Sequence, residues 1–297
     1  RDISTSVNNT IIGGLAGDVI NTGSQNVAVG TAALSSATTS ANNVAIGVDA
    51  LGALTTSARN VAIGTEALNG AMATNSNTYN VAVGFQAGKV VTSGIRNTIV
   101  GGLAGDSLTT GSENVAIGYS ALTTEDAHGR NVAVGGNALR DLNAGADALN
   151  VAVGYDAGLL MSTGTNNTII GGLAGDALTS GSYNVAIGRN ALSAEDAHGT
   201  NVAVGYDTLA LQNAGADAYN TAVGYAAGVN VSTGVQNTIV GGNAGKAFTT
   251  GQRNVAVGYG ALESEDAHGL NTAIGWAALN TLDAGADGLN VAVGYSA

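Results

Sequence analysis

An asparagine followed by an apolar triplet and a glycine recurs through this sequence every 17 to 20 residues. Four such coils form a higher repeat of 70 residues, with one extra coil near 43–59. A short β-branched segment repeated at this spacing is typical of a β-solenoid, in which each coil covers its neighbour. We therefore predict an all-β chain, a single parallel β-solenoid domain over residues 1–297 with about 17 coils of 17–20 residues. The seventeen asparagines are Asn9, Asn26, Asn43, Asn60, Asn80, Asn97, Asn114, Asn131, Asn150, Asn167, Asn184, Asn201, Asn220, Asn237, Asn254, Asn271 and Asn290.

The repeated asparagines and glycines have structural explanations. Stacked at identical corners, asparagine side chains can bond to one another or to the backbone along the solenoid axis. A glycine such as Gly154 or Gly188 ends each strand at a point where a positive φ is easily adopted. We predict this stacking role for the asparagines Asn97, Asn114, Asn131, Asn150, Asn167 and Asn184.

Each apolar triplet has two faces, because side chains alternate along a strand. Val151 and Val153 point one way and Ala152 points the other way. We expect the alanine face to be a stripe of small residues along which a second chain can approach closely, and this favours self-association over a free monomer. The stripe includes Ala28, Ala62, Ala116, Ala152, Ala186 and Ala256.

Charge and composition exclude several classes of protein. The net charge is −12 with only 9 Lys plus Arg, so nucleic acid is not an expected partner. The absence of Cys rules out a disulfide framework and thiolate metal sites. No apolar stretch approaches the length of a membrane span, so we expect no membrane contact by this segment. The chain begins with Arg1 rather than Met, and we expect a fragment or processed form whose export or anchoring signals lie elsewhere.

The motif "NVAIG" with a following "xxAL" resembles the "SVAIG" repeats of YadA-like heads from trimeric autotransporter adhesins, through all seventeen copies. The resemblance implies a left-handed parallel β-roll, three of which pack side by side into a homotrimeric head. Such heads project from bacterial surfaces and bind host matrix, cells or each other. Similar repeats occur in phage tail fibres, so the implied location is extracellular, on a bacterial surface or a virion fibre. The coils of 17 and 19 residues and the 70-residue unit depart from the usual pattern of that family.

The sequence "EDAHG" occurs at 125–129, 195–199 and 265–269 and contains all three histidines, His128, His198 and His268. A carboxylate and an imidazole together could bind a divalent metal. Adjacent Glu and Asp with one His provide few convergent ligands, however, so we interpret the segment as a solvent-exposed turn and expect no metal or other cofactor.

Two other repeated features are candidates for a binding surface. The "AGAD" loops at 144–147, 214–217 and 284–287 lengthen the 19-residue coils, and such insertions often lie on the binding face of a solenoid. Aromatic residues that follow the strand glycine could stack on sugars, although packing over the coil edge is the favoured interpretation. The candidate binding residues are Asp147, Asp217, Asp287, Tyr155, Tyr225 and Tyr295.

The glycine-rich segment "GGLAGD" is similar to calcium-binding nonapeptide repeats, but it does not recur every nine residues, and Lys246 replaces its aspartate in one copy. The segment "GGNAGKAF" lacks the P-loop pattern, and no catalytic motif is present, so we expect no enzymatic activity. The favoured function is an extracellular structural and adhesive rod that displays repeated weak binding surfaces, with a host matrix protein or a surface glycan as partner. The alternatives are a segment of a phage tail fibre or other filament, and a polysaccharide-degrading solenoid with two catalytic carboxylates.

Overall fold

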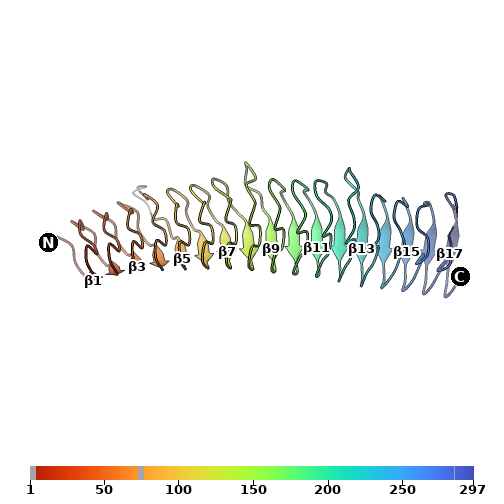
Figure 1. Cartoon of the computed structure of the whole chain (residues 1–297), viewed down its shortest axis with the longest axis horizontal. Coiled ribbons are helices and arrows are strands. Elements are labelled where there is room, and N and C mark those ends of the chain that lie inside the picture. The colour runs from red at the N-terminus through yellow and green to blue at the C-terminus, as the bar shows by residue number, and fades with distance from the viewer. Residues whose placement is uncertain (1–4, 73–76, 284) are drawn as a thin grey trace. The chain divides into compact units, whose positions relative to one another are not determined.

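The computed structural model describes residues 5–72, 77–283 and 285–297, and these residues contain only strands, bridges, turns and bends. They divide into two compact units, Arg1–Leu149 and Asn150–Ala297. Within each unit the chain winds into coils that contribute one three-residue strand each, and successive strands pair in parallel (Figure 1). The predicted parallel β-solenoid is therefore confirmed in both units, whereas the single domain over 1–297 stays a prediction.

The first unit contains eight strands that pair in sequence order without a register slip. The coil that starts at Asn43 pairs through its strand with both neighbours, so the extra coil is an ordinary member of the stack. The strands are β1 (Thr10–Ile12), β2 (Val27–Val29), β3 (Val44–Ile46), β4 (Val61–Ile63), β5 (Val81–Val83), β6 (Thr98–Val100), β7 (Val115–Ile117) and β8 (Val132–Val134).

The second unit contains nine strands with the same parallel, in-register pairing. Residues at equal distances from the strand asparagine therefore lie beside one another in neighbouring coils, and we count coil positions from that asparagine, which is position 0. The strands are β9 (Val151–Val153), β10 (Thr168–Ile170), β11 (Val185–Ile187), β12 (Val202–Val204), β13 (Thr221–Val223), β14 (Thr238–Val240), β15 (Val255–Val257), β16 (Thr272–Ile274) and β17 (Val291–Val293).

The two faces of the strands are the reverse of the predicted arrangement. From β2 to β16 the central residue of every strand is buried, so Ala28, Ala152 and Ala186 lie in the core and not on an outer stripe. The β-branched residues at positions 1 and 3 face outward and are half-buried or exposed. The physical reason is the narrow core, which already contains buried leucines such as Leu34 and Leu192, so the strand contributes the smaller of its two faces.

The asparagines form a hydrogen-bonded ladder inside each unit. The Oδ1 atom of Asn167 accepts the backbone N–H of Asn184 in the next coil (2.8 Å), and the Nδ2 atom of Asn167 donates to the carbonyl of Gly181 in its own coil (2.9 Å). The same pair of bonds links Asn26 to Asn43 and Ser40 in the first unit. Because the side chains are buried, these bonds replace those that the amides lose to water.

The strand glycine is required by the distance between coils. Gly154 has a φ of +143°, and a Cβ built on it would lie 2.5 Å from the carbonyl oxygen of Gly171 in the next coil. Gly188 has a φ of +133°, and a Cβ there would collide with the carbonyl of Gly205. A side chain at this position would therefore strain the backbone and also push two coils apart.

In the core, the sizes of the side chains at positions 2 and 8 compensate for one another from coil to coil. Position 8 is leucine in most coils whose position 2 is alanine, as in Leu122 and Ala116. It is glycine where position 2 is isoleucine, as in Gly105 and Ile99, and also in the alanine coil that precedes such an isoleucine, as in Gly88. The δ1 carbon of Ile99 lies 2.8 Å from a Cβ built on Gly88 in the preceding coil and 3.5 Å from one built on Gly105. The isoleucine therefore fills the space that two missing leucines leave, which explains the glycine of the "LAGD" segments.

This compensation predicts a coupled pair of substitutions. Ile99→Ala should lower the free energy of unfolding by about 2–5 kcal/mol because it leaves a cavity, and Gly105→Leu alone should lower it by about 1–3 kcal/mol because it overfills the core. The double variant recreates the alanine–leucine pattern of the next coil and should lose much less than the two changes added together. Urea unfolding followed by circular dichroism measures the three midpoints, and strictly additive losses would contradict the compensation.

Candidate functional site

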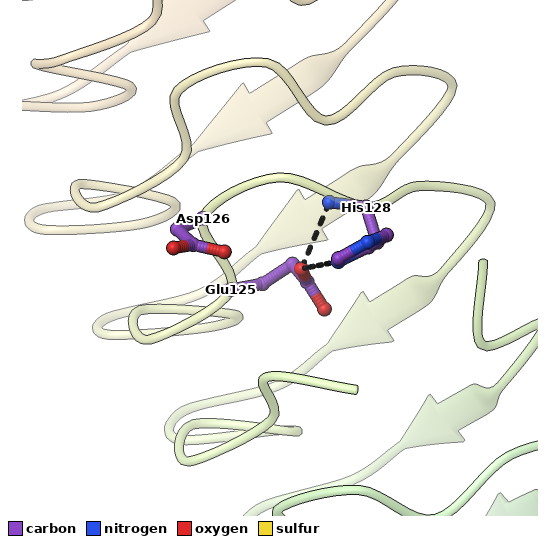
Figure 2. A group of neighbouring side chains, drawn as sticks. All are labelled: Glu125, Asp126 and His128. Atoms are coloured by element: carbon purple, nitrogen blue, oxygen red, sulfur yellow. Dashed lines mark hydrogen bonds and ion pairs between the residues drawn. The ribbon is translucent and has the colours of Figure 1, made fainter. Parts of the chain in front are cut away.

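The glutamates of the three EDAHG turns lie in the core. Glu125 is at position 11, where the coils on either side have the buried leucines Leu108 and Leu142, and it is itself 0% exposed. Asp126 is exposed, and the ring of His128 is partly exposed, on the other side of the turn (Figure 2). The prediction of a solvent-exposed turn holds for the aspartate but is wrong for the glutamate, because position 11 points into the apolar column between coils.

Each buried glutamate is linked to the histidine three residues later. The Oε1 atom of Glu125 accepts the backbone N–H of His128 (3.0 Å) and lies 3.5 Å from Nδ1 of the same residue (Figure 2). In the second unit the corresponding distances are 3.2 and 3.6 Å for Glu195 with His198, and 3.1 and 3.5 Å for Glu265 with His268. Three independent copies therefore adopt one geometry.

The turns contain polar atoms for which the rest of the described chain supplies no hydrogen bond. These atoms are Oε2 of Glu125 and of Glu195, and Nδ1 of His128, His198 and His268. Burial raises the pKa of the Glu195 carboxyl, opposed by the hydrogen bond from the His198 N–H and by the His198 ring. Ligand atoms of the Glu, Asp and His of each turn lie within 4.8 Å of one another, and in the described residues such groups occur only in these three turns.

The AGAD aspartates hold the EDAHG turns from the following coil. Oδ1 of Asp147 accepts the backbone N–H of Gly129 (3.0 Å), and Asp217 and Asp287 do the same for Gly199 and Gly269 (2.9 Å each). All three aspartates are exposed at the surface. Asp147 also pairs with Arg130 (2.9 Å). The aspartates predicted as binding residues are thus hydrogen-bonded to the EDAHG turns. Ala284 of the third AGAD loop lies outside the described residues.

The predicted aromatic residues are exposed and partly stacked on their neighbours. Tyr225 is stacked on Tyr206 with ring centroids 5.5 Å apart, and Tyr295 is stacked on Trp276 at 4.7 Å. Tyr155, Tyr225 and Tyr295 are 63%, 62% and 77% exposed, so these rings do not seal the coil edge as the favoured interpretation supposed. Stacking covers ring faces, so the stacked tyrosines present mainly ring edges and hydroxyl groups to a ligand.

The first and third glycines of the GGLAGD segment are explained by packing between coils. A Cβ on Gly101 would collide with the carbonyl oxygen of Gly118 in the next coil, and the third glycine allows the isoleucine packing described above. In the variant copy GGNAGK, a Cβ on Gly242 would lie 3.3 Å from the Tyr259 ring. Asp106 and Asp176 are half-buried, and each has an Oδ1 atom without a hydrogen bond in the described structure. Burial raises the pKa of both carboxyls, and the charge of Asp156 adds to the rise at Asp176.

No protein-family model, curated protein or solved structure matched this chain. Within the part of the chain that the structure describes, no helix has the length and apolar character that a membrane span requires.

The raised pKa of Asp176 predicts a pH-dependent effect of Asp176→Asn. Below the unfolded-state pKa of about 4, the carboxyl is protonated in both states, and its burial adds no cost of ionisation. As pH rises toward the raised folded-state pKa, ionisation favours the unfolded state, so the carboxyl destabilises the fold. The variant should therefore be at least as stable as the wild type at pH 7, and its advantage should vanish by about pH 3.5. Urea midpoints at both pH values measure this, and Asp106→Asn serves as a second copy. A loss of stability that is equal at both pH values would show a role unrelated to ionisation.

Proposed function

We propose that the chain is a structural and adhesive segment of an extracellular fibre, comparable to the head of a trimeric adhesin on a bacterial surface. In this proposal the coils are left-handed and three chains associate side by side. The observation that supports it most directly is the outward face of the strands, which consists of β-branched, mostly apolar side chains in both units.

The outward face consists of valine, isoleucine and threonine side chains at positions 1 and 3 of every strand. Two residues from each of eight strands give 16 in the first unit, and two from each of nine give 18 in the second. A stable protein interface uses about 20–30 residues from each partner, so the strand face of either unit alone provides much of one. Apolar surfaces of this extent on soluble proteins mark contact sites.

A second copy of the chain is the partner that suits this face. The surface repeats the same β-branched pattern from coil to coil, and a symmetric oligomer places identical patterns against one another. Self-association through this face replaces the predicted contact along the alanine stripe, because the alanines are buried in the core. The net charge of −12 keeps such assemblies apart from one another in solution.

The remaining surface suits multivalent contact. Exposed tyrosines such as Tyr155 and Tyr225 recur with the 70-residue repeat, so weak contacts to a matrix protein or a surface glycan would be multiplied along the chain and across the trimer. Linked weak sites gain affinity through effective concentration without any single strong site. This display of many equivalent sites is the proposed mechanism of adhesion.

Two alternatives make different demands. A phage tail fibre or other filament would use the same self-association, and the domains encoded beside this segment would distinguish it from an adhesin. A polysaccharide-degrading solenoid needs two carboxylates at a fixed separation around the scissile bond. Shortening of polysaccharide chains after long incubation with the purified protein would favour this alternative over adhesion.

Light scattering tests the self-association. The wild-type chain should have three times the mass of one 28.8 kDa chain. Val202→Lys with Val204→Lys places two charges on the outward strand face and should yield monomers, because each charge would be buried in the interface. Asn213→Lys with Gln252→Lys adds the same charge at exposed turn positions and should leave the trimer intact. A monomeric wild type at micromolar concentration would refute the proposed assembly.

A further inference from the structure

We propose that each EDAHG turn binds one divalent transition-metal ion through the side chains of its glutamate, aspartate and histidine. The first site consists of Glu125, Asp126 and His128 (Figure 2), and the second unit repeats it twice. The proposal does not depend on the adhesive function, because it concerns only the chemistry of the turns. Three observations carry it.

The first observation is a buried carboxyl group at a core position that does not require one. The hydrogen bond that the Glu195 side chain accepts from the His198 N–H needs only a neutral oxygen acceptor. Gln212 occupies the same position in the next coil, where its Oε1 accepts a hydrogen bond from Nδ2 of Asn220 (2.8 Å). An uncharged amide is therefore compatible with this column, whereas a buried carboxylate is costly unless a cation compensates for it.

The second observation is a set of possible ligand atoms that have no hydrogen bond. Oε2 of Glu125 and of Glu195 is buried without a hydrogen bond in the described structure, and so is Nδ1 of the histidine in each turn. Both are atoms that ligate metals, and both belong to the same small group of side chains. The existing contact between glutamate and histidine therefore leaves ligand capacity unused.

The third observation is the separation of the ligand atoms. Two ligands that lie about 2.0–2.2 Å from one tetrahedral ion are about 3.4 Å apart. Oε1 of the glutamate and Nδ1 of the histidine are 3.5, 3.6 and 3.5 Å apart in the three turns. One ligand atom of the aspartate lies within 4.8 Å of a ligand atom of the glutamate and of the histidine. Since the aspartate is exposed, its carboxylate can approach by rotation of the side chain.

The ligand set indicates the class of metal. One imidazole with two carboxylates suits zinc, copper or nickel, whereas calcium and magnesium prefer oxygen ligands alone. The histidine side chains are 29% exposed, so an ion can enter from solvent and water can complete its coordination. A bound cation would neutralise the buried glutamate and fix the turn that the aspartate of the next coil already holds.

Zinc titration of the full chain without a polyhistidine tag tests the proposal. Calorimetry and equilibrium dialysis should find three ions per chain, and zinc should raise the urea midpoint because the ion binds only the folded turn. The three histidines of the turns are the only ones in the sequence. Nitrogen ligation seen by electron paramagnetic resonance after loading with Cu²⁺ can therefore be assigned to these sites.

Two variants and a control separate the outcomes. Glu125→Gln with Glu195→Gln and Glu265→Gln keeps the acceptor for each histidine N–H and should weaken zinc binding at least tenfold. His128→Gln with His198→Gln and His268→Gln should do the same and remove the Cu²⁺ nitrogen signal, which keeps the test decisive if the first variant misfolds. Asp49→Asn with Asp156→Asn and Asp207→Asn changes the net charge equally at position 6 and should leave three ions bound. Absence of zinc binding by the wild type at micromolar concentration, or undiminished binding by the histidine variant, would overturn the proposal.

Discussion

The close stacking of one coil on the next is the constraint on which the rest of the structure depends. The strand glycines of consecutive coils lie so near that even a methyl group would collide with the next carbonyl. The asparagine ladder fixes the register at the neighbouring corner, with one side-chain oxygen accepting the backbone N–H of the following coil. Because both features recur in every coil, a change in one coil must be accommodated by its neighbours.

Variation between coils follows from the same constraint. The AGAD loops add two residues to the coil. In most other coils the carbonyl at position 14 accepts the hydrogen bond from Nδ2 of the asparagine at position 0, but in these coils position 14 is displaced to an exposed site, as at Gly215. Nδ2 of Asn201 and of Asn271 is consequently left without a hydrogen bond in the described structure. The aspartate of each loop meanwhile accepts a hydrogen bond from the preceding EDAHG turn. The asparagine ladder therefore loses one hydrogen bond at the place where this new hydrogen bond between coils forms.

The repeat period allowed the strands, their parallel register and the number of coils to be predicted from the sequence. The direction of the strand faces could not be predicted, since alternation tells that Val151 and Ala152 point to opposite sides but not which side is inside. The volume of the coil decides this, and in most coils a buried leucine at position 8 already occupies much of it. The burial of Glu125 was missed because the motif was examined by itself. An alignment of the coils places it in a column with Leu108 and Leu142, and this column is the signal that identifies a core position.

Core and outer face are two consequences of one choice of residues. A coil that admits only alanine from the middle of its strand must place both β-branched neighbours outside, and every additional coil extends that apolar face. The repetition that stabilises each unit therefore also enlarges the outward β-branched surface on which the proposed self-association rests. Under this constraint the EDAHG turns are exceptional, because they place a carboxyl group at a core position that an apolar residue fills in most other coils. The outward strand face follows from the fold and underlies the proposed association, whereas the buried glutamate does not follow from the packing and underlies the proposed metal site.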